Sequence, residues 1–163
     1  MAYVIVEGPA GSQPIDVTDT TKRHQLGRIV VASDPVYFTG EFIYLKGLDT
    51  TAVGTWVTYN MDDGSTTLLA ANAIGPVAVS MSANVTGSYG WYQISGKAVG
   101  KALALYADDA LVFATGTAGS VDDSVVAGDR VKNAKGASAV GTPSTGLAEF
   151  EIQRPFMDDA TAA

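Results

Sequence analysis

Large and small residues alternate along much of this chain, which is the pattern of β-strands. The densest apolar stretch is Tyr89–Ala114, and within it Ala98–Tyr106 places a large side chain at every second position with alanine or glycine between. A period of two suits a strand with one bulky face and one closely approached face. We expect two or three consecutive strands here, folded on each other in the middle of a β-rich domain, with Asp108-Asp109 as a turn.

An amphipathic helix is the alternative for Ala98–Tyr106, because Ala, Leu and Lys all favour helices. Gly96 and Gly100 would each cost about 1 kcal/mol inside a helix relative to Ala. The flanking segments Trp91–Ser95 and Leu111–Ala114 are rich in aromatic and β-branched residues, which favour strands. The strand is therefore the preferred interpretation.

Further strands are predicted on both sides of this stretch, at a spacing of roughly 8–15 residues. Asp62-Asp63-Gly64 predicts a tight hairpin, because Asp and Gly tolerate positive φ. In the last strand Phe150 and Ile152 are expected to face inward, and Pro155 is expected to end it. The pattern indicates an all-β chain folded as an antiparallel β-sandwich or barrel. The other expected strands are Ala2–Glu7, Arg28–Ser33 (apolar enough to be buried on both faces), Glu41–Lys46, Thr55–Asn60, Ser65–Ala70, Gly75–Met81, Arg130–Ala134 and Leu147–Arg154.

The chain is expected to form one β domain over residues 28–156, with an N-terminal arm over 1–27 and a C-terminal tail over 157–163. Gly8–Asp19 is rich in glycine and proline, so we expect it to be extended. The arm is predicted to reach away from the core or to wrap a neighbour. An ordinary edge strand followed by a loop is the alternative.

Composition narrows the classes of function. With 163 residues the chain has the length of one domain, and the absence of cysteine excludes disulfides and thiolate metal sites. The net charge of −7 repels phosphate backbones, so no nucleic-acid partner is expected. Only 17% of residues are charged, against about 25% in typical domains. Such a surface fits a subunit that buries much of itself against neighbours, although a compact β domain that needs few charges explains it equally well.

The N-terminal sequence predicts neither a signal peptide nor a membrane partner. It lacks a basic segment, and its apolar run covers only Ala2–Val6. Elsewhere in the sequence no apolar run approaches the ~20 residues that cross a bilayer as a helix.

No residue pattern predicts catalysis, a cofactor or a metal. His24 is the single histidine, and no nucleophile-elbow motif accompanies it, so a solvated His in the arm is expected. Four Asp-Asp pairs lack the spacing of a calcium loop and are interpreted as turn formers. Asn84 fits a glycosylation pattern that we discount without a secretory signal. A β-fold hydrolase with paired carboxylates is the least supported class.

Five aromatic residues offer an alternative function. They can form a sugar-stacking face, which would make the chain a carbohydrate-binding or adhesin module of a tail or fibre, although such residues more commonly belong to a core or an interface. These residues are Trp56, Tyr59, Trp91, Tyr92 and Tyr106.

The second half of the chain resembles small structural proteins of tailed bacteriophages. The resemblance is carried by Gly90–Gly96 (GWYQISG), Ala118–Asp123 (AGSVDD), Val126–Arg130 (VAGDR), Gly136–Ala139 (GASA) and Pro155-Phe156. It covers the C-terminal half best and the first 40 residues hardly at all. The resemblance implies a virion component, made in the host cytoplasm, of the capsid decoration (cement) type. Such proteins are β-rich, commonly trimeric, and seated where capsid subunits meet.

This interpretation implies the major capsid protein and further copies of the chain, as a homotrimer, as partners. An arm can lay a strand on the edge of a neighbour's sheet, where main-chain hydrogen bonds supply affinity. The residues expected at the protein interface are Tyr3, Val4, Ile5, Val6, Pro9, Ile15 and Phe156.

Overall fold

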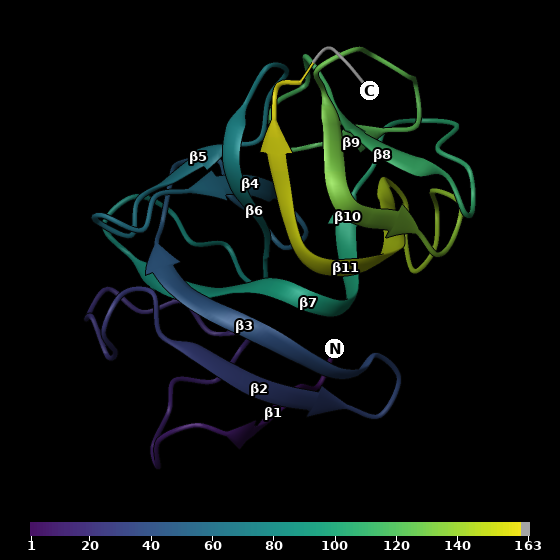
Figure 1. The fold of residues 1–163 in the computed structure, drawn as a ribbon. Helices are drawn as coiled ribbons and strands as arrows, with labels where there is room; N and C mark the ends of the chain where they lie inside the picture. Colours follow the sequence, from purple (N-terminus) through teal and green to yellow (C-terminus); the bar gives the residue numbers. More distant parts are fainter. Residues whose placement is uncertain (161–163) are drawn as a thin grey trace.

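The computed structural model describes residues 1–160 as an all-β fold, in which eleven strands form one antiparallel hydrogen-bonded network (Figure 1). The expected fold class is therefore confirmed. The strands are β1 (Val4–Glu7), β2 (Ile29–Asp34), β3 (Phe38–Lys46), β4 (Trp56–Tyr59), β5 (Thr66–Leu68), β6 (Ile74–Ser80), β7 (Tyr89–Lys101), β8 (Leu111–Ala114), β9 (Val121–Asp122), β10 (Arg130–Gly136) and β11 (Leu147–Asp158).

Strand β7 joins the two parts of the molecule. The strand order is β1-β2-β3-β7-β6-β11-β10-β8-β9, and the β4–β5 hairpin attaches to β6. The first half of β7 pairs with β3, whereas its second half, from Ser95 to Lys101, pairs with β11. In Figure 1, β1, β2 and β3 lie on one side of β7, and β4 to β6 with β8 to β11 lie on the other.

The core consists of three apolar clusters, and β3 is buried between two of them. Phe42 and Tyr44 point into one cluster, while Ile43 and Leu45 point into another. Both faces of this strand are covered, so its alternating sequence reflects two cores rather than one core and solvent.

The largest cluster is enclosed by the strands that follow β3 and is centred on Phe150 of β11. The rings of Trp56 and Tyr106 lie 5.0 and 5.3 Å from the Phe150 ring. An isolated bridge between Ala102 and Val121 connects the end of β7 to β9 and closes the strands around this cluster. The largest cluster is therefore surrounded by paired strands, as in a β-sandwich or barrel.

Two predictions for Ala98–Tyr106 were wrong. β7 ends at Lys101, and the following chain turns at Leu105, which has a φ of +75°. β7 and β8 do not pair with each other, because β7 lies between β3, β6 and β11 while β8 lies between β10 and β9. The turn at Asp108-Asp109 is confirmed, as is the hairpin at Asp62–Gly64 between β4 and β5.

Strand β2 is buried on one face only, contrary to the expectation for Arg28–Ser33. Val30 and Ala32 are buried, whereas Ile29 is 40% exposed. The cluster that includes Ile15 covers the inner face of β2. The outer face is not buried, so the run of apolar residues did not indicate burial on both faces.

Pro155 does not end β11, which continues to Asp158. The register against β10 shifts between Ile152 and Phe156, and Arg154 has a φ of +46°. Beyond this bulge β11 pairs with β6, so Pro155 lies where the strand changes partners and its missing N–H is tolerated. Met157 is fully buried in the largest cluster, so the expected tail begins later than residue 157. Residues 161–163 of that tail lie outside the described residues.

Residues 1–27 pack on the rest of the chain as an edge strand and a loop, the alternative weighed from the sequence. β1 pairs with β2, Ile15 is 1% exposed, and Asp19 exchanges main-chain hydrogen bonds with Tyr89. Residues 1–27 contain no helix. Its predicted reach toward a neighbouring chain stays a prediction.

Candidate partner interface

The free edge of β1 is the first surface that can accept a partner. β1 pairs with β2 on one side, and within residues 1–160 its other side has no strand partner. Val4 and Val6 are 66% and 58% exposed on the outer face. A strand edge with unpaired main-chain groups and exposed valines can accept a further strand.

Alternation along β1 decides which of its residues can contact a partner. Tyr3 and Ile5 face the chain's own core, where the Tyr3 ring lies 4.9 Å from the Phe42 ring. The Tyr3 hydroxyl donates a hydrogen bond to the Lys97 carbonyl. Burial raises the pKa of Tyr3, so its phenol is a neutral donor at all ordinary pH values. Tyr3 and Ile5 thus hold β1 in place, and Val4 and Val6 are left for contact.

Asp34, at the end of β2, fixes the start of β1. Its carboxylate accepts main-chain hydrogen bonds from Ala2, Val36 and Tyr37. Burial alone would raise the pKa of Asp34, but these three hydrogen bonds outweigh burial and hold the pKa below its usual value. The same carboxylate therefore positions both the first residues of the chain and the β2–β3 turn.

That turn carries two exposed apolar residues which the sequence interpretation missed. Val36 and Phe38 are 62% and 70% exposed. Asp34-Pro35 is a turn signal, and it places Val36 in the loop and Phe38 at the first position of β3. We define the β1 edge surface as Val4, Val6, Val36 and Phe38.

A groove of about 460 Å³ runs beside β1. It is bordered by β1 itself and by the loop from Gly8 to Ser12, together with Pro14. Pro9 is half-buried in this border. The register between β1 and β2 shifts between Ile5 and Glu7, and this bulge limits how many main-chain pairs an added strand can form.

The structure does not bring all seven expected interface residues together. Ile15 is buried in the chain's own core and is not available to a partner, so its assignment was wrong. Phe156 is 40% exposed, but it lies on β11 opposite Pro76 of β6, away from β1. Figure 1 shows β1 and β11 in separate parts of the molecule.

The sugar-stacking face that was considered as an alternative does not exist as a surface. Trp56, Trp91, Tyr92 and Tyr106 are 0–1% exposed and pack in the core. Tyr59 alone of the five aromatic residues is partly exposed. The two tryptophans therefore give no basis for a carbohydrate-binding module.

His24 is not a solvated arm residue. Its Nε2 accepts a hydrogen bond from the Gln13 main-chain N–H at 3.0 Å, and its ring lies 5.0 Å from Tyr44 and 5.3 Å from Trp91. Burial, and then the charge of Arg28, lower the pKa of His24. The imidazole thus serves as a neutral acceptor that attaches the first loop to the core.

Asn84, the residue of the glycosylation pattern, lies inside the fold. The Asn84 side chain is fully buried and accepts hydrogen bonds from Thr18 and Ser82. Over residues 1–160, no three His, Cys, Asp or Glu side chains gather as a metal site would require. The same stretch contains no helix with the length and apolar character needed to cross a bilayer.

Comparisons with protein-family models, with curated proteins and with solved structures found no match.

Proposed function

We propose that this chain is a structural virion protein that decorates and stabilises a bacteriophage capsid. It binds the major capsid protein and further copies of itself, as a trimer. The proposal is supported by the resemblance of Gly90–Arg130 to small structural proteins of tailed phages, and by the low content of charged residues.

One structural observation carries the proposal: an open sheet edge flanked by exposed apolar side chains. The β1 edge surface places Val4, Val6, Val36 and Phe38 in solvent, each at least 58% exposed. Covering such side chains removes apolar surface from water, worth about 25 cal/mol per Å² before the costs of association. A partner that binds only the folded chain also stabilises it by mass action.

The first experiment counts the chain in purified virions by quantitative mass spectrometry. Hundreds of copies in each particle support a place on the head, and light scattering of the isolated protein tests the trimer. A handful of copies would instead indicate a tail component, and absence from the particle would overturn the proposal.

The second experiment tests the surface with point variants rather than truncation. Removing residues 1–19 would also take Gln13 and Ile15 from the core, so loss of binding would be ambiguous. Val4→Lys and Phe38→Lys change exposed side chains and are expected to reduce copy number on the particle. Val125→Lys, at a position 80% exposed outside this surface, is the matched control. Equal decoration by all three variants would exclude the β1 edge surface as the contact.

A further inference from the structure

The loop between β7 and β8 presents the most exposed large apolar side chain in residues 1–160. Leu105 is 91% exposed, and its backbone has a φ of +75°, a left-handed conformation that residues with a Cβ rarely adopt. An exposed leucine alone would be ordinary. An exposed leucine on a strained backbone is not, because glycine would relieve the strain and no packing requires the leucine. Strain of this kind is concentrated at functional sites.

The loop is held on both sides of Leu105, so this side chain is presented in a fixed position. Tyr106, the next residue, is 1% exposed and belongs to the largest apolar cluster. The Leu103 N–H donates a hydrogen bond to the Val121 carbonyl, and the Val140 N–H donates one to the Tyr106 carbonyl. An apolar side chain on such a pre-organised loop loses little conformational entropy on binding, which is a property of interface anchors.

Unpaired carboxylates lie beside the same loop. The Asp123 carboxylate accepts a hydrogen bond from the Ala107 N–H at 2.9 Å. Burial raises the pKa of Tyr106, and the charges of three carboxylates raise it further, which places all three near its phenol. These carboxylates belong to Asp123, Asp122 and Asp108. None of the three forms a salt bridge with another group of residues 1–160, so the loop that carries Leu105 is flanked by uncompensated negative charge.

We propose that Leu105 anchors a second docking surface, in which its side chain enters an apolar pocket rimmed by Lys or Arg side chains on the shell protein that the chain decorates. This inference rests on the proposed function and assigns a contact within it. We define the Leu105 anchor surface as Leu105, Asp108 and Asp123. A basic rim attracts the two carboxylates, whereas a second copy of the chain would oppose them with its own net charge of −7.

The Leu105 anchor surface and the β1 edge surface lie in different parts of the fold. The β7–β8 loop is bridged to β9, and in Figure 1 both β8 and β9 lie on the other side of β7 from β1. A chain with docking surfaces in both parts can contact two neighbouring shell subunits at once. Such bridging stabilises a shell, because each contact raises the effective concentration of the other.

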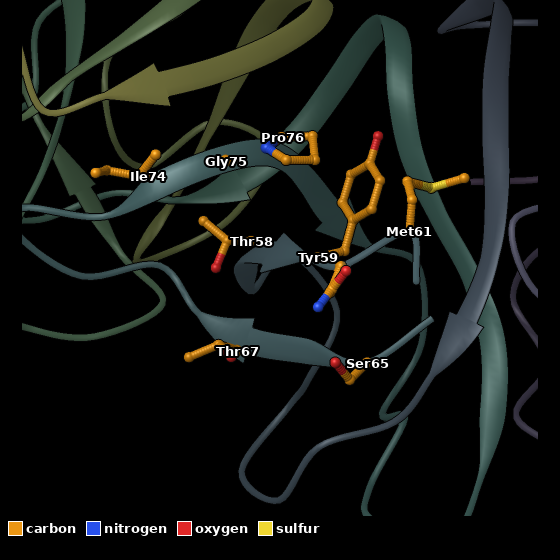
Figure 2. Close-up of a pocket in the computed structure, with 9 residues that line it drawn as sticks. Thr58, Tyr59, Met61, Ser65, Thr67, Ile74, Gly75 and Pro76 are labelled. Carbon is orange, nitrogen blue, oxygen red and sulfur yellow. The ribbon is translucent and has the colours of Figure 1, made fainter. Parts of the chain in front are cut away.

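The test measures attachment of the purified chain to particles assembled without it, with bound copies counted by quantitative mass spectrometry over a range of protein concentrations. Leu105→Ala removes only exposed apolar atoms and is expected to raise the apparent Kd about tenfold or more, the effect of taking one aliphatic side chain from an interface. Ile74→Ala is the matched control and should bind as the unaltered chain does. Figure 2 shows Ile74 at the start of β6, apart from the Tyr59 ring, and its side chain is 70% exposed.

Asp108→Asn tests the basic rim of the pocket. Asparagine keeps a side-chain oxygen that can accept the hydrogen bond from the Asp109 N–H, and it removes the charge. We expect binding to weaken several-fold at low salt, and the difference from the unaltered chain to shrink at high salt, because ions screen exposed charges. Asp62→Asn removes an equal charge at the tip of the β4–β5 hairpin and should leave binding unchanged.

The outcomes separate this inference from the proposed function. If the unaltered chain binds particles and Leu105→Ala binds equally well, or Ile74→Ala loses as much, the anchor is overturned and the decoration proposal stands. If the unaltered chain does not bind particles, both are overturned. Light scattering should give isolated Leu105→Ala the same oligomeric state as the unaltered chain. Dissociation of this variant would show that a second copy receives Leu105, and would overturn the assignment to the shell protein.

Discussion

Trp91 Nε1 donates a hydrogen bond to the main-chain carbonyl of Gln13 at 2.8 Å, across 78 residues of sequence. Both residues are buried, and the other polar groups of Gln13 are also paired. Its main-chain N–H donates to His24, its side-chain amide donates to the Val17 and Tyr89 carbonyls, and its Oε1 accepts from the Tyr44 hydroxyl. Gln13 therefore connects the N-terminal loop to the central strands β3 and β7.

We expect Gln13→Ala to lower the free energy of unfolding by about 2–3 kcal/mol. The substitution removes three side-chain hydrogen bonds and leaves the buried Tyr44 hydroxyl without its acceptor, and a buried unsatisfied polar group costs about 1–3 kcal/mol. Urea unfolding followed by tryptophan fluorescence measures the change. Gln25→Ala, at an exposed position of the same loop, is the control and should have little effect. Equal midpoints for the two variants would contradict the role of Gln13.

A second prediction concerns pH, because the His24 acceptor must be neutral. The pKa of His24 is lowered, first by burial and second by Arg28, so the unfolded chain binds the proton more readily than the folded chain. The stabilisation that His24 contributes is complete above the pKa of its imidazole in the unfolded chain, which is about 6.5. It is lost as the pH falls through the lower pKa of the imidazole in the folded chain.

Urea unfolding between about pH 8 and about pH 5 should therefore show stability falling with acidification, before most carboxylates titrate. In the single-histidine NMR spectrum, the ring protons of His24 should titrate below the value of the unfolded chain. His24→Phe removes the titrating group and should flatten the slope in this window. A folded pKa at or above the unfolded one would refute the prediction.

Alternation in the sequence was sufficient to predict the buried side chains of the last strand. Phe150 and Ile152 face inward as expected, and Asp62–Gly64 forms the expected hairpin. These features depend on near neighbours in the sequence, because strand period and turn chemistry are local properties.

Strand ends were predicted poorly, because partners distant in sequence determine them. β7 ends where the Lys101 N–H bonds to Gly54 and the Leu103 N–H bonds to Val121. β11 passes through Pro155 because it changes partner from β7 to β6. No local pattern around Lys101 or Pro155 contains this information.

The candidate interface was predictable only in part. The short apolar run of β1 identified the strand, but which of its faces is covered depends on contacts of Tyr3 with Phe42 and Lys97. Phe38 was missed because its exposure follows from a turn at the edge of the sheet.

A third prediction concerns Leu105, which is 91% exposed and has a φ of +75°. A left-handed conformation costs an L-residue with a Cβ roughly 1 kcal/mol, whereas glycine adopts it freely. We therefore expect Leu105→Gly to raise the free energy of unfolding by about 0.5–1 kcal/mol, measured by urea unfolding. Leu105→Ala keeps the Cβ and should give no such gain. A loss of stability in Leu105→Gly would show that the leucine side chain contributes contacts that outweigh its backbone strain.

The fourth prediction uses the contact between Gly100 of β7 and Trp56 of β4. A Cβ at position 100 would lie 2.5 Å from Trp56 Nε1 and 2.8 Å from its Cε2, so the indole or the strand must move. We expect Gly100→Ala to lower the free energy of unfolding by about 1–3 kcal/mol, the usual cost of overpacking a core. Gly116→Ala adds the same methyl group where no atom lies within 4 Å, so it should be nearly neutral. Thermal unfolding of the pair measures the difference. If Gly100→Ala matched Gly116→Ala, the Trp56 ring would have room to shift, and the tight contact between β4 and β7 would not be a constraint on the core.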